Sequence, residues 1–409
     1  MQRSLIPQTP SFPLPPSPSK IELAPEHSVK LSPDHHLAYC TNIHPAETWA
    51  ETLHVLKNDV VAVRDRVSPN KPFAIGLRLS AQAAGELLEK NHLDEFQTWL
   101  ESENCYIFTI NGFPYGAFHG TSVKEKVYQP DWTKLARLVY TEQLFTIIDR
   151  LCPADSGGSV STLPGSFKEF EADEQLIFEN LYSLALTIEH LSAKSGKDLH
   201  LGLEPEPLGH FENTEETLAF FKRFFSWCES KDYDQEPIRK HIGINYDTCH
   251  FALEFDDCNQ SLKTLTDAGL RISKIHLSNA LSFNPQNDEA LSAIQQFNEP
   301  TYLHQVILNT APLTRFKDLP EFTGPTNASE GRIHFHVPLY SEPLAPLGST
   351  LDHAEAALNY LQENPKACPH LEIETYTWGV LPGHLQKPLT DQISSEYQWV
   401  FETVRKSSS

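Results

Sequence analysis

The sequence predicts an α/β chain folded as a (β/α)8 barrel, the TIM barrel. Short apolar runs alternate with longer amphipathic segments along most of the 409 residues. A barrel requires this alternation, because each helix returns the chain for the next parallel strand. In the second half of the chain, four runs end in an acidic residue or a histidine, and barrel enzymes place their active sites at the carboxyl ends of the strands. One barrel with loop insertions accounts for the length.

The first four strand and helix units follow one another closely. The runs FAIGLRLS and CYIFTING are almost continuously apolar, which is typical of parallel strands buried on both faces. The segments between the runs repeat apolar residues every three or four positions, as one face of a helix does. We expect strands, each with its following helix, at 36–44 with 47–67, 73–80 with 81–102, 105–112 with 133–151, and 160–165 with 173–196.

The second half continues the pattern up to one long gap. We expect further strands and helices at 199–204 with 214–230, 242–247 with 251–269, 272–278 alone, and 371–378 with 391–406. Residues 280–332, rich in Asn, Gln, Pro and Thr, form an insertion between strands seven and eight. A long connection at the catalytic face is typical of a lid or pocket wall, and a disordered decoration is the alternative. Residues 332–340 alternate up to Pro338, which indicates a short extra strand.

The ends of the chain and its composition set further limits. Residues 1–30 are rich in Pro and Ser, so we expect a flexible tail ahead of a single barrel domain over 31–409. The formal net charge of −22 argues against a nucleic acid partner. Seven cysteines without a CxxC pair indicate reduced thiols. Because no apolar run approaches the ~20 residues of a membrane span and no secretory signal is recognisable, we expect a soluble, cytoplasmic protein.

Four strand ends carry side chains that bind metal ions. LHLGLE ends at Glu204, HIGINYD at Asp247, ISKIH at His276 and LEIE at Glu374. Three carboxylates and an imidazole form a hard donor set that suits a divalent cation such as Mn, Mg, Co or Zn. Singly, Asp247 could be a helix N-cap and His276 could bind a backbone carbonyl. The repeated placement at strand ends favours a common metal site.

Two further glutamates lie close to this set. Glu206 follows Glu204 by two residues, so both carboxylates share one face, and one could bind metal while the other contacts substrate. Glu372 precedes Glu374 by two residues and is the alternative ligand on the last strand. We prefer Glu374, because it lies nearer the carboxyl end of the strand.

Several histidines and one arginine are weaker candidates. His250 lies three residues after Asp247, where the strand turns into a helix, and could orient a substrate hydroxyl. His334 and His336 share a face by period two, and His336 could be a metal ligand, although both could simply pack under the insertion. Two candidates for substrate binding at early strand ends are His44 and Arg78.

At these residues the sequence resembles the xylose isomerase-like TIM barrel superfamily, which holds sugar isomerases, ketose 3-epimerases and endonuclease IV. Its members place Glu on strand five, Asp on six, His on seven and Glu on eight. The resemblance implies these roles for Glu204, Asp247 in a DxxH motif, His276 in IHLSN and Glu374 in IETY. YCTNIHPAETW, HFHVPL and LEIETYTWGVLP are more narrowly similar to a bacterial metabolite-traffic family within it. HLSNALSFNPQ lacks the Arg that epimerases carry there, and His334-x-His336 stands where endonuclease IV has Asp-x-His.

These residues suggest three functions. The first is a metal-dependent isomerase or epimerase acting on a small polyol, sugar or cyclitol-like substrate, with Glu204 and Glu374 as the catalytic carboxylates. The second is phosphoester hydrolysis of the endonuclease IV type with several metals, which would also use His334 or His336. The third is non-catalytic binding or transfer of a metabolite among pathway proteins. Metal content distinguishes the first two, since one ion per chain favours isomerisation and two or three favour hydrolysis.

Overall fold

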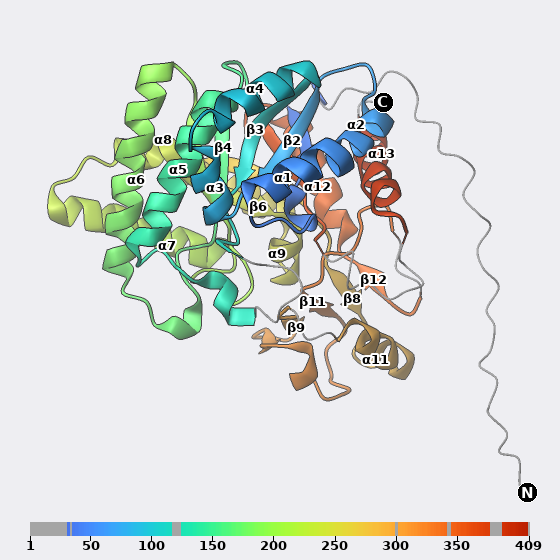
Figure 1. The fold of residues 1–409 in the computed structure, drawn as a ribbon. Coiled ribbons are helices and arrows are strands. Elements are labelled where there is room, and N and C mark those ends of the chain that lie inside the picture. The colour runs from blue at the N-terminus through green and yellow to red at the C-terminus, as the bar shows by residue number, and fades with distance from the viewer. Residues whose placement is uncertain are drawn as a thin grey trace, which may run out of the picture.

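The computed structural model describes residues 31–32, 35–116, 124–298, 302–341, 345–376 and 387–407. The predicted tail over 1–30 lies outside the described residues. An eight-stranded parallel sheet forms the centre of the molecule, with helices on its outside (Figure 1). The strand order is β1-β13-β7-β6-β5-β4-β3-β2, and a parallel bridge between Cys40 and Gly76 joins its two edges. The sheet is therefore a nearly closed barrel, which confirms the predicted fold.

All eight predicted strands are present. They are β1 (His36–Tyr39), β2 (Phe73–Arg78), β3 (Cys105–Asn111), β4 (Gly158–Thr162), β5 (Leu199–Leu203), β6 (Ile242–Asp247), β7 (Ile272–Leu277) and β13 (His370–Ile373). Apart from the half-buried Tyr106, every strand residue is buried. Burial on both faces explains why these segments read as continuous apolar runs. The buried polar residues at the carboxyl ends of the strands form the site described below.

Several of the helices begin or end at recognisable caps. Their bounds are α1 (Trp49–Val55), α2 (Val61–Val67), α3 (Ala81–Leu87), α4 (His92–Ser102), α5 (Leu135–Leu151), α6 (Glu174–Ser195), α7 (Thr214–Lys231), α8 (Glu236–His241), α9 (Thr248–Leu253), α10 (Cys258–Asp267), α12 (Leu351–Glu363) and α13 (Leu389–Ser407). Thr48 and Glu51 form a capping box at α1, and Gly196 ends α6 in the left-handed conformation.

Two segments predicted as single helices are each broken. The segment 81–102 divides into α3 and α4 near Lys90, and 251–269 divides into α9 and α10 near Phe255. Both residues have positive φ, 50° and 61°, which a continuous right-handed helix does not allow. The segment 47–67 also contains a π-helical turn, Leu56–Val60, between α1 and α2. Apolar periodicity continues across each break, so the sequence pattern does not reveal it.

The segment between β7 and α12 folds into a second sheet. Its antiparallel strands are β8 (Leu281–Phe283), β9 (Val306–Leu308), β10 (Thr314–Phe316), β11 (Gly331–Ile333) and β12 (Gly348–Ser349), in the order β10-β9-β11-β8-β12, and α11 (Asp288–Ile294) follows β8. The sheet lies beyond α9, at the end of the barrel where the carboxyl ends of the strands meet (Figure 1). The strand expected over 332–340 covers only Gly331–Ile333, and residues 334–340 continue without strand pairing toward the barrel mouth.

Two expectations from composition can be compared with the structure. All seven cysteines are buried and unpaired, as predicted for reduced thiols. Within the described ranges, no helix has both the length and the apolar character needed to cross a membrane.

Candidate metal and substrate site

The four predicted ligand side chains converge at the carboxyl ends of β5, β6, β7 and β13. One ligand atom from each of Glu204, Asp247, His276 and Glu374 lies within 4.8 Å of all the others, and all four residues are buried. The Nδ1 atom of His276 is central: Glu204 Oε1 and Glu374 Oε2 lie 3.1 Å away, and Asp247 Oδ2 lies 3.8 Å away. We call these four residues the quartet.

Strand register brings the quartet together. Asp247 on β6 pairs with His276 on β7, and His276 pairs with Glu372 on β13. Glu374 lies one pleat beyond Glu372, and its backbone N–H donates to Leu277 O over 3.0 Å. Because side chains alternate along each strand, His276, Glu372 and Glu374 all point into the barrel. The structure therefore places Glu374 in the quartet and Glu372 one layer deeper.

The quartet has the donor set and spacing of a divalent cation site. Metal–ligand bonds near 2.1 Å place neighbouring ligand atoms about 3.0 Å apart in an octahedron and about 3.4 Å apart in a tetrahedron. The distances of 3.1 to 3.8 Å around His276 Nδ1 are of this size. Asp247 Oδ1 accepts from His250 N and Ser278 Oγ, whereas Oδ2 has no hydrogen-bond partner among the described residues. A buried carboxylate oxygen left in this way fits a cation.

The protonation of the site reflects its excess of negative charge. Burial alone would lower the pKa of His276, but the carboxylates of Glu374 and Glu204 raise it well above its usual value. Burial would likewise raise the pKa of Glu374, but the charge and hydrogen bond of His276 lower it. A single proton on His276 thus balances only part of the charge of three carboxylates, and a divalent cation would balance more.

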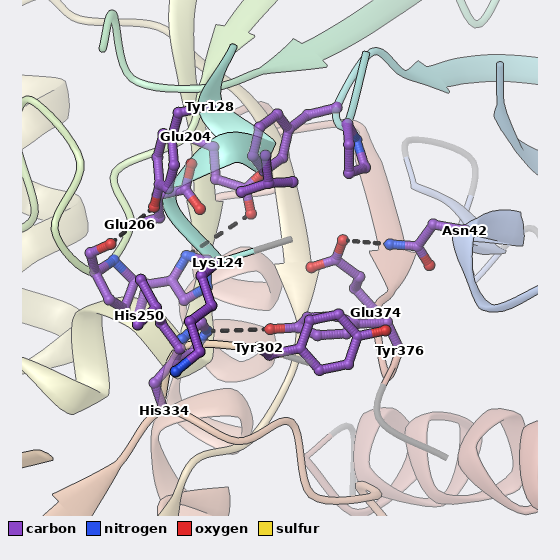
Figure 2. Close-up of a pocket in the computed structure, with 15 residues that line it drawn as sticks. Asn42, Lys124, Tyr128, Glu204, Glu206, His250, Tyr302, His334, Glu374 and Tyr376 are labelled. Carbon is purple, nitrogen blue, oxygen red and sulfur yellow. Dashed lines mark hydrogen bonds and ion pairs between the residues drawn. The ribbon is translucent and has the colours of Figure 1, made fainter. Parts of the chain in front are cut away.

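A pocket opens above the quartet. Figure 2 shows Glu204, Glu206 and Tyr128 on one side of it and Glu374 with Asn42 on the other. Its wall is largely aromatic and is formed by Phe113, Tyr128, Tyr302 and Tyr376. Among the described residues that line the pocket, Lys124 is the one lysine or arginine, and its Nζ lies 2.9 Å from Asp318 Oδ2. The pocket is therefore acidic and suits a neutral, hydroxyl-rich molecule.

Glu206 lines this pocket, as the sequence indicated. Its carboxyl is buried, and its Oε1 has no hydrogen-bond partner among the described residues. Burial, followed by the nearby charge of Glu204, raises its pKa well above the usual value. A protonated carboxyl can donate a hydrogen bond that a carboxylate cannot.

His250 and His336 meet beside the quartet. His250 Nδ1 lies 3.0 Å from Pro205 O and His336 Nδ1 lies 2.7 Å from Glu374 O, so each Nδ1 donates to a carbonyl. Their Nε2 atoms face each other at 3.4 Å. Asp247, His250 and His336 form one group of possible ligands, and His336 also groups with Cys249 and His334. His336 is thus adjacent to the quartet but outside it.

The structure places His44 and Arg78 away from the pocket lining. The Arg78 guanidinium donates to Ala46 O and Gly116 O, both over 2.6 Å, and so braces two loops. His44 Nε2 lies 3.0 Å from the Tyr39 hydroxyl. Neither residue is brought to the quartet, because Arg78 holds the loops that follow β1 and β3 and His44 contacts Tyr39 on β1.

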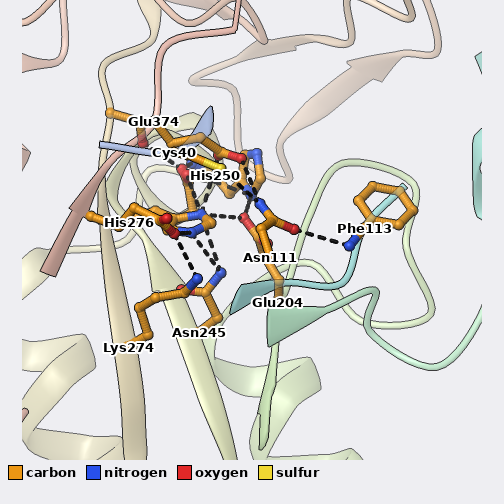
Figure 3. Close-up of polar contacts among 12 residues, drawn as sticks. Cys40, Asn111, Phe113, Glu204, Asn245, His250, Lys274, His276 and Glu374 are labelled. Carbon is orange, nitrogen blue, oxygen red and sulfur yellow. Dashed lines mark hydrogen bonds and ion pairs between the residues drawn. The ribbon is translucent and has the colours of Figure 1, made fainter. Parts of the chain in front are cut away.

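Sequence reasoning missed two asparagines at the site. Asn42 Nδ2 donates to Glu374 Oε1 over 2.9 Å (Figure 2). Asn111 Nδ2 donates to the same oxygen over 3.3 Å (Figure 3). Both follow or end an early strand, so the strand-end placement that revealed the quartet could also have revealed them. Tyr302 and Lys124 carry no such signal, because they lie in connections that have no regular periodicity.

The chain is similar in structure to several solved proteins. A xylose isomerase domain protein from Planctomyces limnophilus has a TM-score of 0.49 and 13% identity over 92% of this chain and 98% of its own. An L-ribulose 3-epimerase has a TM-score of 0.48 and 11% identity over 91% and 95%. The IolI protein, solved with a bound zinc atom, has a TM-score of 0.43 and 11% identity over 91% and 96%. No protein-family model and no curated protein matches the chain. We therefore infer function from the side chains themselves.

Proposed function

We propose that this protein is a metal-dependent isomerase or epimerase of the xylose isomerase-like superfamily that acts on a small polyol, sugar or cyclitol-like substrate. The supporting observation is the quartet, in which three buried carboxylates surround one imidazole nitrogen. Glu204, Asp247, His276 and Glu374 would hold one divalent cation, Mn, Mg, Co or Zn. Such a cation, when bound, polarises a carbonyl and lowers the pKa of the adjacent C–H and O–H groups.

Two carboxylates supply the acid and base chemistry. Glu204 follows β5 and Glu374 follows β13, with β6 and β7 between them in the barrel. Side chains from these two strands approach a substrate carbon from different sides, so that one removes a proton and the other returns a proton to the opposite face. Asn42 and Asn111 both donate to Glu374 Oε1 and thereby orient that carboxylate.

The pocket wall matches the proposed substrate class. The rings of Tyr302 and Tyr376 lie 5.4 Å apart at an angle of 75° and present an apolar surface to the C–H face of a sugar or cyclitol ring. Glu206 and His250 offer polar atoms to substrate hydroxyls. Lys124 is already paired with Asp318, so the described lining offers little to a phosphate group.

The sequence suggests where this activity belongs. The segments YCTNIHPAETW, HFHVPL and LEIETYTWGVLP resemble the bacterial metabolite-traffic protein EboE. We therefore assign the reaction to a cytoplasmic biosynthetic pathway, whose other proteins are candidate partners.

Solvent-exchange labelling tests the proposal. Protein loaded with Mn²⁺ is incubated in D2O with a panel of free ketoses and inososes, and deuterium at the carbon next to the carbonyl is followed by NMR. We expect incorporation that is lost after chelation and lost in Glu374→Gln. The matched control is Glu396→Gln, which changes a buried carboxyl on α13 outside the pocket and should label substrate normally. Equal labelling by Glu374→Gln and wild type would exclude Glu374 as the base.

A second candidate function is supported by the His250 and His336 pair. Both Nδ1 atoms donate to backbone carbonyls, so two Nε2 lone pairs face each other at 3.4 Å and repel unless a proton or cation lies between them. A second metal there would favour phosphoester hydrolysis by several metals. Elemental analysis distinguishes the two functions: one ion per chain favours isomerisation, and two or more favour hydrolysis.

A further inference from the structure

A fully buried ion pair lies one layer below the quartet. Lys274 Nζ is 2.6 Å from Glu372 Oε2, and both side chains have 0% exposure. Lys274 precedes His276 by two residues on β7, and Glu372 on β13 precedes Glu374 by two residues. Strand alternation therefore points both side chains into the barrel, directly beneath the quartet. Figure 3 shows Lys274 below His276 and Glu374 above it.

Stability does not explain this pair. Burying two charges costs several kcal/mol per ion, and exchanging a buried pair for well-packed apolar residues is often neutral or stabilising. The surrounding barrel is also shaped to admit Glu372. A Cβ atom added to Gly76 would lie 1.9 Å from Glu372 Oε1 and 2.5 Å from Tyr39 O, so β2 leaves the space that the carboxylate occupies. The pair is thus built into the barrel at an energetic cost.

The pair contacts a quartet member directly. Glu372 Oε2, which accepts from Lys274 Nζ, also lies 2.9 Å from His276 Nε2. The carboxylate oxygen accepts at both contacts, so His276 Nε2 carries the hydrogen. The other nitrogen, Nδ1, faces Glu204 Oε1, Glu374 Oε2 and Asp247 Oδ2. In the metal-free protein Nδ1 also carries a hydrogen, because two carboxylate oxygens lie 3.1 Å from it. A bound cation would take the place of that hydrogen, while Nε2–H stays on Glu372.

We infer that Lys274 and Glu372 are positioning residues that hold His276 as its Nε2–H tautomer and thereby set the affinity of the quartet for a divalent cation. This inference rests on the metal site of the proposed function. Lys274 acts through Glu372: its ammonium keeps Oε2 in place as the acceptor for Nε2–H. Partners that orient a ligating histidine in this way typically change metal affinity by about 10- to 100-fold.

Mn²⁺ titration of the metal-free, full-length protein by calorimetry tests the inference. The variants are Glu372→Gln, Lys274→Met and the double variant. The amide of Glu372→Gln can donate to Nε2 and so move the histidine proton to Nδ1, and we expect Mn²⁺ binding about 10- to 100-fold weaker than in wild type. The control Glu254→Gln removes another buried carboxylate from its ion pair with Arg315, away from the quartet, and should bind Mn²⁺ as wild type does.

The double variant separates positioning from stability. A single variant leaves one unpaired charge inside the barrel, whereas the double variant leaves none. Lys274→Met/Glu372→Gln should therefore fold even where a single variant does not. If the pair only stabilises the fold, the folded double variant should bind Mn²⁺ with normal affinity. If the pair positions His276, the double variant should fold and still bind Mn²⁺ weakly. Affinity within threefold of wild type in the double variant overturns the inference and leaves the proposed function intact. A wild-type protein that takes up no Mn²⁺ overturns both.

Discussion

Replacing Asp247 with Asn should stabilise the metal-free protein while weakening cation binding. The amide oxygen can keep the contacts of Oδ1 with His250 N and Ser278 Oγ, and Asn caps a helix about as well as Asp. The amide nitrogen replaces Oδ2, the oxygen without a hydrogen-bond partner among the described residues. The substitution therefore changes charge at the quartet with little change in shape.

The expected gain follows from the distances in the quartet. The Asp247 carboxylate repels Glu204 and Glu374, which lie within 4.8 Å, by about 3.5 kcal/mol or more each at an effective dielectric constant of about 20. It attracts a protonated His276 at 3.8 Å by about 4.4 kcal/mol under the same conditions. The two repulsions outweigh the attraction, so removing the charge should stabilise the apoprotein by roughly 2 to 3 kcal/mol.

Two measurements separate these effects. Chemical denaturation in the presence of EDTA gives the stability of the metal-free protein, and calorimetric titration with Mn²⁺ gives the affinity for the cation. We expect Asp247→Asn to raise the midpoint of unfolding without metal and to lower Mn²⁺ affinity by at least tenfold. Asp257→Asn is the matched control, because Asp257 caps α10 through Gln260 N over 2.9 Å and lies outside the quartet. It should change neither quantity. Metal-free Asp247→Asn that is less stable than wild type would refute the argument from carboxylate repulsion.

Further predictions concern metal and pH. Mn²⁺ at 100 times its Kd should raise the free energy of unfolding of the wild type by about 2.7 kcal/mol. This rise would be measured as a higher Tm that EDTA reverses. At the same Mn²⁺ concentration, Glu374→Gln should show no such rise. Burial lowers the pKa of His353 to about 4 and of His370 to about 3. Below pH 6.5 these two histidines take up a proton in the unfolded chain but stay neutral in the folded protein. Each should therefore lower the free energy of unfolding by roughly 1.4 kcal/mol per pH unit as the pH falls below 6.5. Urea unfolding between pH 7 and 4.5 measures this loss, and a flat profile would contradict it.

Much of the barrel and the quartet could be predicted because both depend on local order in the sequence. Continuous apolar runs mark strands that are buried on both faces, and parallel pairing brings their carboxyl ends to one edge. The convergence of Glu204, Asp247, His276 and Glu374 follows from this order, because all four lie at the carboxyl ends of strands. The sequence also indicated Glu206, whose position two residues after Glu204 keeps it on the same face.

Other features depend on contacts that sequence order does not encode. The sequence favoured Glu374 over Glu372 from its position nearer the strand end, but the burial of Lys274 against Glu372 depends on the register between β7 and β13. The breaks near Lys90 and Phe255 depend on single backbone angles that leave the apolar periodicity unchanged.

By itself, then, the sequence determined the alternation of strands and helices and which side chains end each strand. The tertiary structure was needed to show that Arg78 braces loops and that Tyr302 and His334 reach the pocket from the segment between β7 and α12. The insertion is built by antiparallel pairing of β8 with β11 and β12, about 50 or more residues further along the chain. Such long-range pairing depends on which backbone groups meet after folding, whereas strand alternation and its period of two are properties of neighbouring residues.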